Sequence, residues 1–308
     1  MSLKIVHSNF LALIQDYGRY GYQSIGVTNG GPLDEHAFLW ANYLLDNHYD
    51  AAQLEISYGS FSAVFTEDTM MAICGANLGC TLNQQEIFPW CSYAVKSGDV
   101  IQFSSPVSGL RCYLAVKGGF DIVKQLSSSS TVVREKLGGL SQNGAKLAKD
   151  DVLPYTSHSA ETAKQVPFRF IPEYPKDIIL RYMPNVSQTS AGIDAQKKFS
   201  HKQYEVTQNI DRMGYRLSGE PIVTPLAGII SQGISMGAIQ VPKDGQPIVL
   251  MRDRQTMGGY PLIGCVTYLD LSKLAQSLPG TKVSFHAIDV SEAEAELILH
   301  KQFFKITS

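Results

Sequence analysis

Amide side chains recur in one glycine-rich stretch of the chain, residues 231–261, which reads SQGISMGAIQVPKDGQPIVLMRDRQTMGGYP. Short apolar runs there predict strands, and the glycines and prolines between them predict turns. Gln240, Gln246 and Gln255 are therefore expected at or beside strand ends. Because an amide carries both donors and an acceptor, such a cluster suits a ligand that is itself an amide, lactam or ureido group. The alternative is a set of hairpin turns with solvated polar residues.

Two arginines flank a glycine just upstream, in the sequence DRMGYR. A guanidinium group binds carboxylate or phosphate through a two-point fork, and Gly214 lets the backbone approach a ligand closely. Arg212 and Arg216 are therefore predicted to clamp an anion. The alternative is a surface ion pair with Asp211 or Glu220, since exposed pairs of this kind are frequent and weak.

These two groups of residues predict one cleft in the C-terminal half of the chain. We expect the arginines to hold a carboxylate or phosphate while Gln240 and Gln255 contact an amide of the same ligand. Asp253 is predicted to be catalytic, orienting or deprotonating that amide, and Tyr260 is a further candidate substrate-binding residue.

A second polar group lies among glycines near the N-terminus and contains Asp16, Arg19 and Asp34. Arg19 is a candidate substrate-binding residue and Asp34 a candidate catalytic carboxylate. Simple capping of a helix that begins after Asp34 explains that aspartate equally well.

Three sequence patterns bear on the catalytic groups and cofactors that the chain could use. Residues 233–237 match the G-x-S-x-G nucleophile elbow, but Pro242 and Pro247 exclude the helix that must follow Ser235, so a serine hydrolase is not expected. The seven histidines have no metal-ligand spacing, and no metal site is expected. The sequence contains no G-x-x-x-x-G-K-[ST] loop, so any ATP contact must use another architecture.

Composition excludes several classes of partner. A net charge of -2 over 308 residues provides no basic field for nucleic acid. No apolar run approaches the roughly 20 residues that span a bilayer, and the first residues do not resemble a signal peptide. Five cysteines without a C-x-x-C pair are typical of free thiols in a reducing compartment, which predicts a cytoplasmic protein away from membranes.

The element pattern is mostly β with few helices. Residues 34–46 predict a helix, and a second one is expected at the C-terminus in AEAELILHKQFF. Elsewhere runs rich in Val, Ile, Phe and Tyr alternate with turn residues. A polar stretch at 141–165 predicts a linker between an N-terminal subdomain, 1–140, and a C-terminal one, 166–308. The alternative is a surface excursion within one domain.

Four segments in order carry a family resemblance. They are LALIQDYGRYGYQSIGVTNGGPLDEHAFLWANYLLDN at 11–47, RCYLAVKGGFD at 111–121, DRMGYRLSG at 211–219 and GAIQVPKDGQPIVLMRDRQTMGGYP at 237–261. Together they resemble the biotin-dependent carboxyltransferase family, also called allophanate hydrolase subunit 2, which includes the C subunit of bacterial 5-oxoprolinase and an antagonist of a sporulation-kinase inhibitor. One departure is that Ser129, in the run SSSST, stands where relatives have an arginine, so that arginine's role is not transferred.

The resemblance implies a fold and a function. The fold is two β-rich subdomains (class α+β), the C-terminal one a cyclophilin-like β-barrel. The function is that of a subunit of an ATP-dependent 5-oxoprolinase, a hydrolase that opens a cyclic amide, 5-oxoproline, to L-glutamate. It implies activity only in a complex with a subunit-B-like (allophanate hydrolase subunit 1-like) protein and a subunit-A-like protein.

The family also implies two alternatives. One is a carboxyltransferase module that moves a carboxyl group from biotin, held on a separate carrier, to a urea-like acceptor. The other is a non-catalytic regulator that binds a kinase inhibitor.

Overall fold

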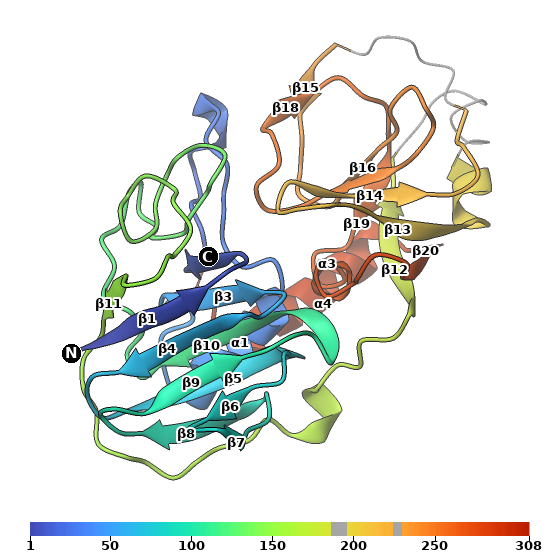
Figure 1. Ribbon diagram of the computed structural model, residues 1–308. Helices are drawn as coiled ribbons and strands as arrows, with labels where there is room; N and C mark the ends of the chain where they lie inside the picture. Colours follow the sequence, from blue (N-terminus) through green and yellow to red (C-terminus); the bar gives the residue numbers. More distant parts are fainter. Residues whose placement is uncertain (186–195, 224–229, 308) are drawn as a thin grey trace. The chain divides into compact units, whose positions relative to one another are not determined.

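Two compact units make up the chain (Figure 1). The computed structural model describes residues 1–185, 196–223 and 230–307. The first unit comprises Met1–Tyr20 and Asn29–Tyr174, and the second comprises Gly21–Thr28 and Pro175–Ser308. Most of the chain before Tyr174 therefore forms one unit, while a short N-terminal segment has its contacts in the other.

The first unit contains two antiparallel sheets. One has the strand order β11 (Val152–Pro154), β1 (Ser2–Ser8), β4 (Phe61–Phe65), β9 (Val100–Phe103), β6 (Thr81–Leu82) and β7 (Gln85–Glu86). The other has the order β2 (Ala12–Gln15), β3 (Gln53–Ser57), β10 (Ser108–Val116), β5 (Thr69–Asn77) and β8 (Cys91–Val95). A short 3-10 turn, η2 (Phe168–Phe170), lies near the end of the unit.

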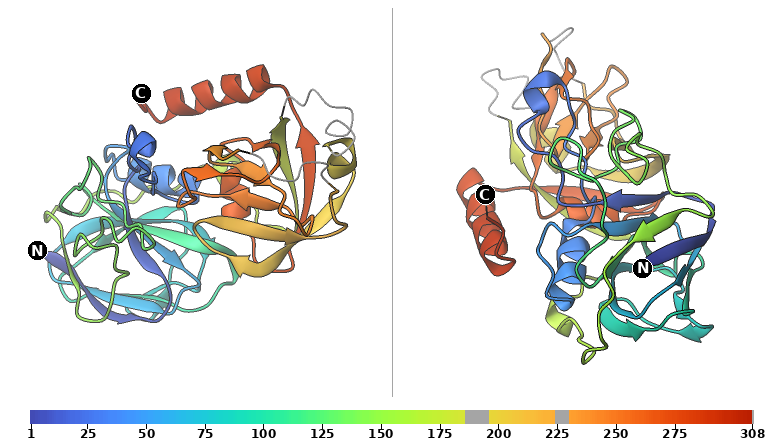
Figure 2. Two further views of the ribbon diagram at one scale, coloured as in Figure 1. Left: turned by 90° about the horizontal axis from the view of Figure 1, so that it is seen from above. Right: turned by 90° about the vertical axis from the view of Figure 1, so that its left-hand side faces the viewer.

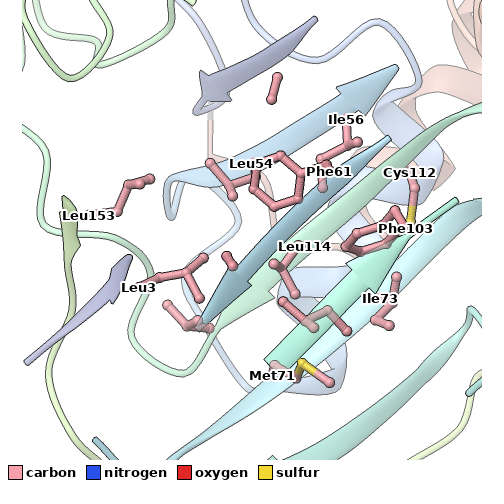
Figure 3. Packing of buried hydrophobic residues seen from close by; sticks show 14 of the residues in the cluster. Leu3, Leu54, Ile56, Phe61, Met71, Ile73, Phe103, Cys112, Leu114 and Leu153 are labelled. Atoms are coloured by element: carbon pink, nitrogen blue, oxygen red, sulfur yellow. The ribbon is translucent and has the colours of Figure 1, made fainter. Parts of the chain in front are cut away.

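The core of this unit gathers apolar side chains from strands of both sheets (Figure 3). Strand β4 alternates buried and half-buried residues, as expected for a strand with one face in the core. Strands β5 and β10 are buried along nearly their whole length, because α1 also packs against them.

Helix α1 (Glu35–Leu44) begins where the sequence predicts. The Asp34 carboxylate accepts a hydrogen bond of 3.0 Å from the backbone N–H of Ala37, which is ordinary N-capping. The helix ends at Leu44, because the backbone of Leu45 no longer has helical φ and ψ angles.

The stretch predicted as a linker, 141–165, is packed within the first unit. Its strand β11 pairs with β1 through Val152, Leu153 and Pro154, and Leu153 is fully buried. The division found from contacts falls later, after Tyr174. Three residues of the stretch form the edge strand β11, and their pairing with β1 fixes this part of the stretch on the sheet despite its polar composition.

The second unit is a closed barrel of seven strands. Their order is β12 (Asp177–Pro184), β19 (Leu262–Val266), β16 (Ala238–Gln240), β17 (Ile248–Leu250), β14 (Gly214–Ser218), β13 (Gln203–Ile210) and β20 (Lys282–Ala287). The pair β12 and β20 is parallel and closes the barrel. This barrel confirms the mostly β fold expected for the C-terminal part.

Smaller elements complete the second unit. They are η1 (Gln23–Ile25), a two-stranded sheet of β15 (Gln232–Gly233) and β18 (Met257–Gly258), helix α3 (Leu271–Ala275) and helix α4 (Val290–Phe303). Figure 2 shows α4 following β20 as the last element of the chain. The predicted C-terminal helix is thus present, capped by Asp289, and none of its residues is fully buried. None of the helices among the described residues combines the length and the hydrophobicity of a membrane-spanning segment.

Candidate functional site

Strand register places a predicted amide and a predicted cation on one face of the barrel wall. Arg216 lies opposite Ile248, Ile248 lies opposite Gln240, and Gln240 lies opposite Leu262. Residues directly opposite each other in a sheet point to the same side, so these four side chains form a row across four strands. We call this set the face row.

The neighbouring positions point to the other side of the same strands. Tyr215, Val249 and Ile239 are paired across the strands and are fully buried. They fill the barrel interior, which leaves the face row on the outside of the barrel wall.

The two predicted glutamines meet over this wall. A Cβ built on Gly258 would lie 2.9 Å from Gln240 Nε2, 2.9 Å from Gln255 Nε2 and 2.3 Å from Ile234 Cδ1. Three side chains therefore converge on one glycine that has room for none of its own. We call Gln240, Gln255, Ile234 and Gly258 the amide cluster.

Gln240 is the most unusual member of the amide cluster. It is only 2% exposed, and its Nε2 has no hydrogen-bond partner among the described residues. Leaving a buried donor unsatisfied costs about 1–3 kcal/mol. Ile234, whose side chain reaches Gly258, packs with Ala238 and Leu250. The cluster therefore contains a buried N–H donor to which the described residues offer no acceptor.

Arg212 and Asp253 form a buried ion pair. Arg212 Nε and Nη2 donate to the two oxygens of Asp253 at 2.8 and 3.0 Å, and each side chain is 5% exposed. The Asp253 N–H also donates to the Arg212 carbonyl at 2.8 Å. The fork predicted to clamp a ligand anion thus binds a carboxylate of its own chain, and the pair is buried rather than at the surface.

Arg216 is held more loosely. It pairs with Asp244, and the two side chains are 32% and 48% exposed. Exposed pairs contribute little free energy, so a ligand carboxylate can compete with Asp244 for this guanidinium. Of the two predicted arginines, Arg216 is the one that shares a face with Gln240.

The remaining predicted residues of this half are not part of the amide cluster. Tyr260 is 45% exposed. Gln246 braces a turn instead, because its amide donates to the Gly219 carbonyl and accepts from the Gly219 N–H.

Ser235 lies in an exposed loop followed by strand β16, so the helix needed after a nucleophile elbow is not there. The nearby Cys265 thiol lies 3.7 Å from the Ser235 hydroxyl, and burial raises the pKa of Cys265.

Among the described residues, no group of three or more His, Cys, Asp and Glu side chains is arranged to hold a metal ion.

The N-terminal candidates belong to the first unit and have local partners there. The Asp16 carboxylate accepts hydrogen bonds from the hydroxyls of Ser128, Ser129 and Ser130, at 2.5, 3.0 and 2.6 Å, and from the Ser129 N–H at 2.6 Å. Ser129, the departure from the family pattern, is thus one of the residues that surround Asp16. Arg19 donates to backbone carbonyls, including those of residues 125 and 128.

The sequence did not predict that Gly258 must lack a side chain, nor that the Ile234 side chain packs beside the two glutamine amides. The Gly258–Gly259 pair was visible in the sequence, but it signals a turn equally well. Nothing in the sequence linked Ile234 to either glutamine.

Comparison with known proteins gives the class of the chain. A family model described as carboxyltransferase domain, subdomain A and B, matches residues 25–287, and the chain belongs to that family. Within it, the chain is similar to the C subunit of 5-oxoprolinase from Escherichia coli (strain K12), with 33% identity over 94% of this chain and 93% of that protein. The family resemblance inferred from the four sequence segments is confirmed.

Two larger proteins contain a similar region. Urea amidolyase of Saccharomyces cerevisiae is 32% identical over 88% of this chain, which spans 16% of that protein. The crystal structure of the K. lactis urea amidolyase superposes with a TM-score of 0.90 and 26% identity over 98% of this chain, which spans 20% of that one. The fold is therefore shared along nearly the whole chain.

Proposed function

We propose that this chain is the C-subunit-like component of an ATP-dependent 5-oxoprolinase, which opens the lactam of 5-oxoproline to L-glutamate. The observation that carries the proposal is the match to the C subunit of 5-oxoprolinase, which covers 94% of this chain and 93% of the relative, so that the two proteins match along nearly their full lengths. Urea amidolyase matches over a similar part of this chain but is mostly composed of other regions.

The face row supports the proposal chemically. It presents a cation at Arg216, an apolar side chain at Ile248 and an amide at Gln240. 5-Oxoproline presents a carboxylate, ring methylenes and a lactam. Arg216 and Gln240 are separated by two strand spacings, about 10 Å, a distance that their long side chains shorten toward a small ligand over Ile248.

The proposal gives each residue of the site a role in binding 5-oxoproline. Gln240 Nε2 donates to the lactam carbonyl, and the Gln255 amide oxygen accepts the lactam N–H. Arg216 exchanges Asp244 for the ligand carboxylate. Asp253 and Arg212 hold the loop that carries Gln255, so we reassign Asp253 from a base to a structural anchor, and Asp34 from a catalytic carboxylate to a helix cap.

The proposal assigns ATP binding to the other subunits of the complex. The sequence has no G-x-x-x-x-G-K-[ST] loop, Arg216 is the one cation in the face row, and the amide cluster contains no charged residue, so no step is assigned to ATP on this chain. We propose that subunit-B-like and subunit-A-like proteins assemble with the chain in the cytoplasm and that cleavage requires all of them. The E. coli relative is itself one subunit of an enzyme, which supports such a complex.

Reconstitution tests the proposal. The three proteins are co-expressed, purified by size exclusion, and assayed for glutamate released from 5-oxoproline with and without ATP. We expect one co-eluting complex with ATP-dependent activity. Separate peaks at micromolar concentration together with no cleavage would contradict the proposal.

A matched pair of variants tests the site. Gln240→Met keeps the length of the side chain and removes the buried donor, so we expect about 10-fold to 100-fold lower kcat/KM. Gln246→Met changes a glutamine of the same segment whose amide braces Gly219 and is not part of the amide cluster, and activity should stay within about two-fold of wild type. Equal effects of the two substitutions would contradict the assignment.

The carboxyltransferase alternative has its own support, because the structural match to urea amidolyase covers 98% of this chain. The ureido ring of biotin, carried on a separate protein, also offers a carbonyl to Gln240. The same reconstituted preparation, mixed with a carboxybiotin carrier and urea, separates the two: carboxylation of urea without 5-oxoproline cleavage favours the alternative.

A further inference from the structure

A short N-terminal segment forms part of the barrel unit. Gly21–Thr28 has its contacts with the second unit, although the chain on both sides belongs to the first. The segment closes on itself, since the Gly26 N–H donates to the Gln23 carbonyl at 3.0 Å and the Val27 N–H to the Tyr22 carbonyl at 3.3 Å. These bonds join backbone groups alone, and the Gln23 side chain makes its contact outside the turn.

Both ends of this segment bind the loops that carry the amide cluster. Gln23 Nε2 donates to the Ile234 carbonyl at 3.0 Å, and the Thr28 hydroxyl donates to the Arg254 carbonyl at 3.4 Å. Arg254 Nε donates to the same Ile234 carbonyl at 3.1 Å. The four residues therefore form one continuous network in which Ile234 and Arg254 are each held by the N-terminal segment.

Ile234 is the link to the ligand-binding residues. Its N–H donates to the Thr256 carbonyl at 3.0 Å, so both polar groups of its backbone are fixed. Ile234 is 1% exposed, and its Cδ1 lies 2.3 Å from the position that a Cβ on Gly258 would take, a position 2.9 Å from both glutamine Nε2 atoms. A shift of the Ile234 backbone therefore moves one wall of the amide cluster.

We infer that Gln23 is a positioning residue for the binding of small cyclic amides. It fixes Ile234 through its donated hydrogen bond, and Ile234 keeps Gln240 and Gln255 converged on Gly258. The inference rests on the proposed function and adds to it: part of the ligand-binding geometry is set by the N-terminal segment, outside residues 231–261.

Three variants isolate the donated hydrogen bond. Gln23→Met keeps the length of the side chain but cannot donate. Gln23→Lys restores a donor of similar reach. Ser24→Ala is the matched control, because Ser24 is an exposed neighbour in the same turn.

In the reconstituted complex, Gln23→Met should raise KM for 5-oxoproline about 3-fold to 10-fold, the worth of one net hydrogen bond, with kcat within about two-fold of wild type. Gln23→Lys should recover most of the KM, and Ser24→Ala should match wild type. A role in folding alone would lower the active fraction and so reduce kcat at constant KM. That pattern, or equal KM values for the Met and Lys variants, would overturn the inference.

A second measurement needs no activity and separates this inference from the proposed function. Amide hydrogen exchange on the isolated chain should be faster at Ile234 and Gly258 in Gln23→Met than in wild type, and unchanged in Ser24→Ala. If the wild-type complex does not cleave 5-oxoproline, the proposed function fails and exchange alone decides: faster exchange at both sites supports the positioning role, and unchanged exchange refutes it.

Discussion

Substituting Gly258 by alanine tests the amide cluster most directly. The new Cβ would lie 2.3 Å from Ile234 Cδ1 and 2.9 Å from each glutamine Nε2. Carbon atoms in contact are normally about 3.5–4.0 Å apart, so Ile234 must retreat by more than 1 Å and both amides by about 0.5 Å. The backbone is not the obstacle, because Gly258 does not have a positive φ.

The expected cost has two parts. Overpacking of this kind typically destabilises a protein by about 1–3 kcal/mol. Displacement of binding groups by up to 1 Å can cost about 100-fold in rate, so we expect kcat/KM for 5-oxoproline to fall about 10-fold to 100-fold. Thermal unfolding measures the first part, and the glutamate-release assay measures the second.

Two further variants make the test specific. Gly233→Ala alters the paired strand of the same small sheet, where a new Cβ meets nothing within 4 Å, so activity should be unchanged. Ile234→Val removes Cδ1, the atom in closest conflict, and added to Gly258→Ala it should recover part of the activity. If Gly258→Ala behaves like Gly233→Ala, or if Ile234→Val gives no recovery, the convergence of these side chains has no functional role.

Three other outcomes are expected. Asp253→Asn removes the carboxylate charge that Arg212 binds through two hydrogen bonds and should destabilise the chain by about 3–5 kcal/mol in chemical denaturation; a loss below about 1 kcal/mol would contradict a stabilising role of this ion pair. Arg216→Ala should leave stability within about 0.5 kcal/mol but raise KM for 5-oxoproline, and Arg216→Lys should be nearly as harmful because lysine lacks the planar fork; normal KM in both would exclude Arg216 from the site. Burial opposes ionisation of Asp270, but hydrogen bonds from Arg181 and Lys273 outweigh it and lower the pKa of Asp270, so its contribution to stability is present above the ordinary carboxyl pKa and lost as the pH falls through the lowered value; Asp270→Asn should flatten acid denaturation in that range, and an unchanged profile would refute this.

Local signals in the sequence predicted local structure well. Helix α1 was predictable because its cap, Asp34, and its apolar face are close in sequence. Strand β9 occupies residues 100–103, where β-branched and aromatic residues predicted a strand. The barrel was predicted only through the family resemblance, because the pairing of strands that are far apart in sequence leaves no local signal.

The partners of polar groups were much harder to predict. The chemistry of DRMGYR indicated that Arg212 binds a carboxylate, but not that Asp253, 41 residues away, provides it. Arg216 and Gln240 share a face only because of the register of β14, β17 and β16, and a shift of one residue would have placed them on opposite sides.

The path of the chain between the two units has a consequence for its synthesis. The chain passes from one unit to the other after Tyr20, after Thr28 and after Tyr174. Residues 21–28 leave the ribosome early, but their partners Ile234 and Arg254 are made some 200 residues later, tens of seconds afterwards at about 5–20 residues per second. A fragment that begins at Pro175 would contain every barrel strand and still lack Gln23 and Thr28, which bind the carbonyls of Ile234 and Arg254. The second unit therefore reaches its final form only when residues 21–28 and the barrel strands have both been translated.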